Sequence, residues 1–477
     1  MATATQEQQP APGSVGSSAA TLADQPARRF LVFVIIALAL IMVAIDSTIV
    51  STALDALQKG LDTTINWAGW TLTAYAFGLT LMLPISGKLG ERYGGRRVFI
   101  GSVLVFTLAS LLCGLTSNIY VLIVLRVLQA AGGAGFTPAA TGIIVDHFGN
   151  ARDRAVSLFG TMFPIGAMIG PIFGGFFVTY WSWRAVFFVN VPIGLAILAL
   201  AFHYIPHDRH KTRERRSMDL PGLALLGACI LCAMLAVNFL AEPGVHLWSP
   251  RFVIPALVAL ASGPLFWRHI TRSAQPFILP RLLSESKFSS VNLINAIFGG
   301  VTIGSVALIP LYAINRYGMN ALQSGSLLIA QGIGTIVISI VAVALLRRTG
   351  YRRPLYLGGS LIGLGFLLVA LPPVGGVSPY AWLVIGALVV GAGNGIANPA
   401  SRNAGLQLAP QHSATLAALR TLFIQFGSIA TISIATAILA SVAHPASAQP
   451  WIYVAAALVY LAAIPAVMKV PEHHGAW

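Results

Sequence analysis

A single carboxylate interrupts the apolar stretch 30–50, FLVFVIIALALIMVAIDSTIV, and it belongs to Asp46. The stretch has the length of roughly 20 residues that a helix needs to cross about 30 Å of hydrocarbon. Because an ionised side chain is costly at such a depth, a buried acid faces a water-filled cavity, a partner or a proton pathway. Asp46 is therefore the leading candidate for a proton carrier. The alternative is a structural group hydrogen-bonded to a neighbouring helix.

A second apolar stretch, 119–141, contains Arg126 and Gln129. If a helix begins near Ile119, Arg126 lies about 10 Å deep at 1.5 Å per residue. Asp46 lies at a comparable distance from the outer end of the first helix. We therefore expect the acid and the base at similar depths, and a purely structural charge pair is the alternative.

Composition indicates the elements that must position these side chains. The chain of 477 residues is 56% hydrophobic and only 9% charged, whereas soluble proteins average about 25% charged residues. This small number of charges could not cover the surface of a soluble domain. We therefore predict an all-α polytopic membrane protein with 14 transmembrane helices. The predicted spans are 30–50, 67–85, 98–116, 119–141, 154–177, 185–205, 220–240, 250–267, 289–312, 323–346, 354–372, 380–400, 414–441 and 451–468.

The order of these spans predicts two six-helix bundles with a central inserted helix pair. Two six-helix halves are a recurrent transporter design, in which substrate binds near the membrane midplane between halves that rock. The segment 276–286 is too short to cross and is expected to lie in the cytoplasmic interface. The predicted parts are a disordered cytoplasmic tail at 1–27, a bundle at 28–205, a basic linker with the inserted pair at 206–287, a bundle at 288–470 and a cytoplasmic tail at 471–477.

The formal net charge of +15 has two explanations. A soluble protein with this charge would be a candidate for nucleic-acid binding, but Lys and Arg also crowd the cytoplasmic loops of membrane proteins. We favour the second explanation, which excludes a nucleic-acid partner and places both termini in the cytoplasm. Only four basic residues then fall in outer loops, namely Lys59, Arg184, Arg251 and Arg316.

Residues for other kinds of chemistry are scarce. Cys229 and Cys232 form a C-x-x-C within an apolar stretch, without a second ligand pair nearby, so we predict no metal site and no cofactor. An enzyme would need a nucleophile with a base or a cluster of metal ligands inside the spans, and we find no catalytic residues there. A receptor would need a sizeable soluble domain, and no loop is long enough. A membrane enzyme or receptor is thus disfavoured.

The segment 87–97 is a basic, glycine-rich stretch between the second and third predicted spans. It resembles the signature that the major facilitator superfamily carries at this place, and a solvated basic loop is the alternative. Its glycines would allow a tight cytoplasmic turn, while its acid and arginines could pair. Glu91 stands where the family usually has Asp, one methylene shorter. The residues of this gating motif are Gly87, Gly90, Glu91, Arg92, Gly94, Arg96 and Arg97.

Two further motifs resemble the same family. Arg126-x-x-Gln129 resembles its fourth-helix signature, and this resemblance would put the first and fourth helices on one central cavity, with Arg126 as the partner of Asp46. The fifth predicted span resembles the antiporter signature, which separates exporters from symporters. A generic face for tight helix packing is the alternative. The residues of this antiporter motif are Gly166, Gly170, Pro171, Gly174 and Gly175.

The stretch from Asp46 to Leu54 and the segment 181–194, WSWRAVFFVNVPIG, resemble the fourteen-span drug:proton antiporter branch of this superfamily. This resemblance implies proton-coupled efflux of amphipathic small molecules, including antibiotics, with multidrug resistance as the consequence. It also implies a proton gradient as the energy source. We further expect lipid as surroundings, a functional monomer and, because no transit peptide is recognisable, a location in the cell inner membrane. A dedicated exporter of one metabolite or siderophore is the alternative.

Uncharged polar residues in the spans are candidates for substrate contacts, although such residues also form hydrogen bonds between helices. Arg420 is expected to reach toward the cytoplasmic interface and to be structural. The spans contain one acid against two arginines, which favours a neutral, monocationic or anionic substrate over a dication. The possible substrate contacts are Gln129, Asn292, Asn295, Gln331, Asn394 and Asn398.

Overall fold

The structure is a computed structural model of the chain and describes residues 26–147, 152–206, 219–273, 275–276, 278–407, 413–470 and 472. Helices account for all regular structure in these residues, and no strand occurs among them. The predicted tails at 1–27 and 471–477 lie almost entirely outside the described residues, as does the basic stretch 207–216.

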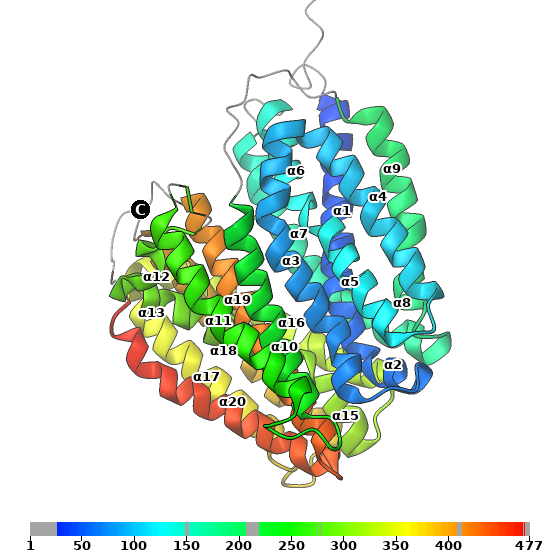
Figure 1. Cartoon of the computed structure of the whole chain (residues 1–477), viewed down its shortest axis with the longest axis vertical. Helices are drawn as coiled ribbons and strands as arrows, with labels where there is room; N and C mark the ends of the chain where they lie inside the picture. The colour runs from blue at the N-terminus through cyan, green and yellow to red at the C-terminus, as the bar shows by residue number, and fades with distance from the viewer. Residues whose placement is uncertain are drawn as a thin grey trace, which may run out of the picture.

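The first bundle lies on the right in Figure 1 and holds the Asp46 region. At its centre the rings of Phe99 and Phe136, and of Phe106 and Phe136, lie 5.9 and 5.6 Å apart. Its helices are α1 (Pro26–Thr52), α2 (Leu54–Gly60), α3 (Ile65–Tyr93), α4 (Gly95–Leu115), α5 (Ile119–Ala134), α6 (Phe136–His147), α7 (Arg152–Tyr180), α8 (Ala185–Phe188) and α9 (Asn190–Tyr204).

The remaining helices form the central pair and the second bundle. The aromatic rings of Tyr312, Phe366 and Tyr453 pack together in the core of this bundle. These helices are α10 (Leu220–Leu240), α11 (Pro250–Arg272), α12 (Arg281–Ser284), α13 (Ser286–Ile294), the π-helix η3 (Asn295–Val301), α14 (Thr302–Ala307), α15 (Ile309–Tyr317), α16 (Ala321–Thr349), α17 (Arg352–Ala370), α18 (Pro379–Gln407), α19 (Ser413–Ser441) and α20 (Pro445–Val467).

Twelve helical segments of the described residues are long and apolar enough to cross a membrane. The predicted total of fourteen is not confirmed, because α3 and α7 are not among the twelve. Both are 29 residues long and lie where the second and fifth spans were predicted. Within α7, the stretch Gly166–Tyr180 forms a shorter apolar helix.

Three predicted spans are not continuous α-helices. The fourth is interrupted at Gly135, the sixth at Val189, and the ninth contains η3 and a further interruption at Leu308. A proline follows each interruption within three residues. Because proline has no N–H and clashes with the carbonyl one turn earlier, it is accommodated best in the first turn of a new helix. These prolines are Pro138, Pro192 and Pro310.

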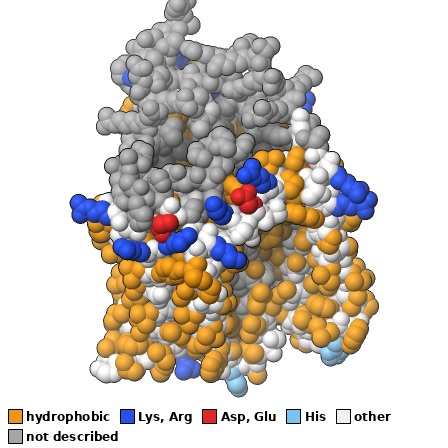
Figure 2. All heavy atoms as spheres, turned by 90° about the vertical axis from the view of Figure 1, so that its left-hand side faces the viewer, with side chains coloured by type: hydrophobic (Ala, Val, Ile, Leu, Met, Phe, Trp, Pro, Cys, Tyr) orange, Lys and Arg blue, Asp and Glu red, His pale blue; other side chains and the backbone are white. Residues whose placement is uncertain are grey.

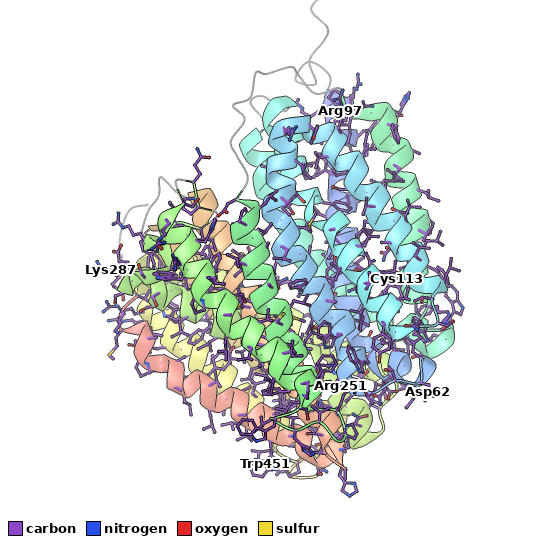
Figure 3. All side chains as sticks on the ribbon, viewed as in Figure 1. Asp62, Arg97, Cys113, Arg251, Lys287 and Trp451 are labelled. Carbon is purple, nitrogen blue, oxygen red and sulfur yellow. The ribbon has the colours of Figure 1, made fainter. Side chains whose placement is uncertain are left out.

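The surface matches a membrane environment. Figure 2 shows a broad apolar surface on one side of the molecule, bordered by a band of Lys and Arg side chains. In Figure 3, Arg97 and Lys287 lie toward one end of the helices, and Asp62, Arg251 and Trp451 toward the other. The first two belong to segments predicted to be cytoplasmic, Asp62 and Arg251 to predicted outer loops, and Trp451 to the predicted outer end of the last span. Which end faces the cytoplasm stays a prediction.

The two bundles approach each other closely at the predicted outer end. A Cβ added to Gly69 of α3 would lie 2.7 Å from the Thr436 methyl group in α19. A Cβ added to Gly175 of α7 would lie 2.8 Å from the carbonyl oxygen of Ala321, the first residue of α16. Helices come this close only where one of them lacks a side chain.

Candidate functional site

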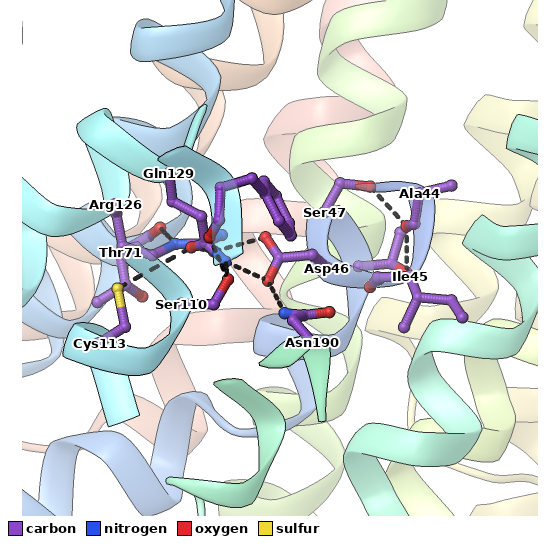
Figure 4. A network of polar contacts seen from close by, with 12 residues as sticks. Ala44, Ile45, Asp46, Ser47, Thr71, Ser110, Cys113, Arg126, Gln129 and Asn190 are labelled. Atoms are coloured by element: carbon purple, nitrogen blue, oxygen red, sulfur yellow. Dashed lines mark hydrogen bonds and ion pairs between the residues drawn. The ribbon is translucent and has the colours of Figure 1, made fainter. Parts of the chain in front are cut away.

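Asp46 is fully buried inside the first bundle and accepts three hydrogen bonds (Figure 4). Arg126 Nη1 donates to its Oδ2 at 2.7 Å, while Gln129 Nε2 and Asn190 Nδ2 donate to its Oδ1 at 2.8 and 2.9 Å. These partners lie on α5 and α9, so the carboxylate joins three helices. The predicted contact between Asp46 and Arg126 is therefore present, while its role in proton coupling stays a prediction.

The Arg126 side chain is also fully buried and is held from several sides. Its Nη1 also donates to Gln129 Oε1 at 2.6 Å, and its Nε donates to the Thr71 carbonyl oxygen at 3.0 Å. Its guanidinium carbon lies 4.1 Å from the centre of the Tyr75 ring, within range of a cation–π interaction. A buried ion pair needs such additional contacts to offset the loss of hydration.

The expected cavity position of this pair is not what the structure shows. Asp46 and Arg126 both have 0% exposure, so in this conformation neither lines an accessible cavity. Gln129, predicted as a possible substrate contact, is buried as well and donates to Ser110 Oγ at 2.7 Å. Gln129 is therefore a member of the buried charge network, because its amide is used to satisfy the carboxylate.

Asn190 is the hydrogen-bond partner of Asp46 that the sequence interpretation missed. It is 1% exposed and begins α9, directly after the interruption at Val189. Its signal was present in the segment 181–194, where a single amide stands among apolar residues. Its partner lies 144 residues away in the chain, so spacing along the sequence could not identify the contact.

The antiporter motif supplies the close contact between α7 and α1. A Cβ added to Gly170 or Gly174 would lie 2.8 or 2.6 Å from the carbonyl oxygens of Ile45 and Ile49. Gly166 makes a similar contact one turn earlier, where an added Cβ would lie 2.8 Å from the Ile41 carbonyl oxygen. This glycine face thus brings α7 against the turns of α1 around the buried acid.

The same motif also faces the second bundle. The carbonyl oxygen of Pro171 would lie 2.5 Å from a Cβ added to Gly325 of α16, and Gly175 contacts the first turn of that helix. The motif therefore has close contacts on two sides, one within its bundle and one across the boundary between bundles. The predicted role in tight packing is confirmed, and a role in antiport stays a prediction.

The expected loop at 87–97 is wrong. The helix α3 continues to Tyr93 and α4 begins at Gly95, so Gly94 alone forms the turn. Its φ is 92°, a conformation that glycine adopts without steric cost. Its N–H donates to the Gly90 carbonyl oxygen at 3.0 Å, which closes the end of α3. One permissive residue is enough for the turn.

The charged residues of this gating motif have varied surroundings. Arg96 Nη2 donates to the Phe202 carbonyl oxygen at 2.8 Å and so connects α4 to α9. Arg92 and Arg97 are exposed. A Cβ added to Gly87 would meet nothing within 4 Å. The Glu91 side chain lies outside the described residues, so its predicted pairing with arginines stays a prediction.

Two of the amides proposed as substrate contacts hold helices together. Asn292 Nδ2 donates to the Leu282 carbonyl oxygen at 2.9 Å, and Asn295 Oδ1 accepts from Ser401 Oγ at 2.5 Å. Both asparagines are buried. The alternative of helix-to-helix hydrogen bonds therefore describes them better than a substrate contact, because each buried amide already makes such a bond within the protein.

The other three amides are more accessible. Gln331 is half-buried and its Nε2 donates to Thr335 Oγ1 at 3.1 Å on the same helix. Asn394 is half-buried, and Asn398, one turn further along α18, is exposed. Substrate contact stays a prediction for these three residues.

The cysteines are not arranged as a disulfide or as a metal site. Cys229 Sγ lies 3.5 Å from the Ala259 carbonyl oxygen, and all three cysteines are free thiols. In the part of the chain that the structure describes, no group of three or more His, Cys, Asp or Glu residues could hold a metal ion.

Comparison with known proteins gives the family context. The family model described as Major Facilitator Superfamily matches residues 36–432. A multidrug resistance protein B homolog from Mycobacterium tuberculosis is 34% identical over 331 residues, which are 69% of this chain and 61% of that relative. The chain thus spans less than two thirds of the length of that protein. A putative multidrug resistance protein MdtD from Salmonella paratyphi B is 30% identical over 347 residues, 71% of this chain and 72% of that protein.

Solved structures resemble the overall fold. A D-xylose-proton symporter superposes with a TM-score of 0.65 at 14% identity, covering 93% of this chain and 98% of that structure. A peptide transporter POT in complex with sulfate superposes with a TM-score of 0.63 at 17% identity, covering 94% and 96%. At this level of identity the likeness concerns the fold alone.

Proposed function

Because the chain belongs to the major facilitator superfamily, we propose that it is a fourteen-span, proton-coupled antiporter that exports amphipathic small molecules. The relatives named as multidrug resistance proteins support efflux as the direction of transport. The export would cross the inner membrane of the cell, with both termini in the cytoplasm and the proton gradient as the energy source.

The lengths of α3 and α7 support fourteen spans. Each has 29 residues, which corresponds to about 43 Å at 1.5 Å per residue and exceeds a hydrocarbon core of about 30 Å. Each also packs against helices that are long and apolar enough to cross the membrane, α5 in the case of α3 and α1 in the case of α7. If α3 and α7 also cross the membrane, they and the twelve segments that are long and apolar enough to do so would make fourteen.

The fully buried ion pair of Asp46 and Arg126 is the observation that carries the proposal. Protonation of Asp46 would remove the counterion of Arg126 and weaken the hydrogen bond from Asn190, which starts α9. The start of α9, directly after the interruption at Val189, would then be held less tightly to α1. Proton binding would in this way change the packing of the first bundle.

The contacts between bundles support alternating access. Close packing at Gly69 and Gly175 closes the boundary at the predicted outer end, so the structure corresponds to a state that is shut toward the outside. Export requires this contact to open while the opposite end closes. Glycine faces suit such a movement because backbone surfaces without side chains can separate and repack with little interlocking.

The test is transport by the purified protein in lipid vesicles. An imposed proton gradient should drive movement of a fluorescent lipophilic dye by the wild type, and Asp46→Asn should reduce that movement at least tenfold. Asp62→Asn is the matched control, because it makes the same chemical change at an exposed position. This variant should transport like the wild type.

Undiminished gradient-driven movement in Asp46→Asn at equal protein content would refute proton coupling at this residue. Failure of the wild type to move any of a panel of lipophilic dyes would instead contradict broad efflux. A dedicated exporter of one compound would then be the better description.

A further inference from the structure

Arg420 lies in the second bundle and is hydrogen-bonded to the neighbouring helix α18. It is the eighth residue of α19 (Ser413–Ser441), about 10 Å along the helix from its first residue. Its Nη2 donates to Asn398 Oδ1 at 2.8 Å, and its Nε is buried without a hydrogen-bond partner among the described residues. The guanidinium is thus held by α18 and keeps an unused donor.

No carboxylate of its own bundle can neutralise this arginine. The sequence from 288 to 470 contains neither Asp nor Glu. A second cation, Arg402 of α18, also acts on Arg420 and adds repulsion. A buried or half-buried guanidinium without a counterion is unfavourable in a membrane protein, so the missing negative charge must come from outside the bundle.

The position of Asn398 indicates that this pair faces water and not lipid. On the same helix, the exposed residues Ile385 and Leu388 have the apolar character of a lipid-facing surface. At 3.6 residues per turn, Asn398 lies roughly 140° and 80° around the helix from them. An exposed amide bonded to a guanidinium at this depth fits a water-filled passage, because polar groups within spans face cavities.

We propose that Arg420 and Asn398 bind the anionic group of the transported molecule, so that amphipathic carboxylates or sulfonates are substrates. The inference rests on the proposed export function and names its substrate class. Arg402 adds attraction at longer range, and the half-buried Asn394, one turn away on α18, extends the polar surface.

The chemistry suits an oxyanion. A guanidinium presents N–H donors in a planar fork that matches the two oxygens of a carboxylate. The unused Nε–H supplies one donor, and the Asn398 amide can turn its NH₂ group toward the ligand once an anion replaces its oxygen at Nη2. A cationic substrate would instead add a third positive charge beside Arg420 and Arg402.

Equilibrium binding tests the proposal without any proton gradient. The protein is placed in nanodiscs of zwitterionic phosphatidylcholine, and binding of dansylglycine is compared with that of the neutral dansylglycinamide by fluorescence. Arg420→Gln should weaken dansylglycine binding on the order of tenfold to a hundredfold and leave dansylglycinamide unchanged. Arg420→Lys, which keeps the charge without the fork, should lie between wild type and Arg420→Gln.

Two variants serve as controls. Arg348→Gln removes an exposed arginine at the end of α16 and should bind both probes like the wild type. Asp46→Asn should retain Arg420-dependent binding while losing gradient-driven transport, so that failure of the proposed function and failure of this inference give different results.

The inference is overturned if Arg420→Gln binds dansylglycine as tightly as the wild type, or loses both probes equally. It is also overturned if the wild type binds neither probe. Displacement of dansylglycine by phosphatidylglycerol in the nanodiscs, without competition from other soluble carboxylates, would assign the site to a lipid headgroup and overturn the assignment to substrate.

Discussion

Each bundle holds an arginine within a membrane helix, and the two arginines are neutralised in different ways. Arg126 of the first bundle is fully buried against Asp46, at 2.7 Å. Arg420 of the second bundle has an amide at 2.8 Å and no acid in residues 288–470. The first charge is compensated within its bundle, whereas the second has no acid in its own bundle and, in our proposal, binds an anionic ligand.

This difference separates two tasks. A closed ion pair can respond to a proton, because protonation of the acid changes the balance inside the bundle. An arginine without a neighbouring acid can bind an anionic ligand, which then serves as its counterion until the ligand is released. We therefore expect the first bundle to carry the energy coupling and the second to contribute to substrate selection.

The largest effect should come from breaking the closed pair. Arg126→Leu leaves the buried Asp46 carboxylate without its cation and should lower the free energy of unfolding by about 3–5 kcal/mol. Arg420→Leu orphans no carboxylate in its bundle and should cost less than about 1.5 kcal/mol. Reversible unfolding in mixed micelles measures both. Equal losses would contradict the difference between the two arginines. Adding Asp46→Asn to Arg126→Leu should restore part of the stability, because it removes the unpaired carboxylate.

Asparagines at helix contacts sharpen the comparison. Asn190→Ala removes a hydrogen bond to a charged group and should cost about 1.5–3 kcal/mol, whereas Asn295→Ala removes a bond to a neutral hydroxyl and should cost about 0.5–1.5 kcal/mol. The same unfolding measurement applies. A charged Asp46 predicts a larger loss for Asn190→Ala than for Asn295→Ala. The reverse order would contradict a charged Asp46.

The packing that holds α1 in place can be tested at its glycines. Gly174→Ala places a Cβ about 2.6 Å from the Ile49 carbonyl oxygen and should destabilise the protein by about 1–3 kcal/mol. Gly87→Ala meets nothing within 4 Å and should stay within about 0.5 kcal/mol of wild type. A thermal shift in detergent would separate them. Similar melting temperatures would show that α7 can move away from α1 at little cost.

The smallest effect is expected for a pair at the surface. Lys59 Nζ lies 2.9 Å from Asp55 Oδ2, but the lysine side chain is 73% exposed. Lys59→Gln should change stability by no more than about 1 kcal/mol, and less as salt is added. A larger loss of stability that does not depend on salt would contradict the comparison. The exposed Lys59–Asp55 pair would then stabilise the protein as much as the buried pair of Asp46.

Much of the fold could be predicted from the sequence. Every predicted span falls on helical residues, eleven of them on one continuous helix and three on interrupted ones, since about 20 apolar residues with few charges make a local signal that needs no tertiary information. Twelve of the fourteen predicted spans fall on helical segments that are long and apolar enough to cross a membrane. The interruptions at Gly135 and Val189 were missed, although a proline follows each, because a proline inside a span leaves open whether the helix bends or starts anew.

The class of the protein and the charges at Asp46 and Arg126 can be recognised from the sequence alone, because a charge in an apolar stretch stands out wherever the chain folds. The pairing of these two charges was implied by the resemblance to the major facilitator superfamily. Only the tertiary structure decided which amides meet them, since Asn190 lies 144 residues from Asp46. It also decided that Gln129 is buried and that Arg420 faces Asn398. Helix rotation and packing set these contacts, and the apolar signal that defines a span is nearly the same for every rotation about its axis.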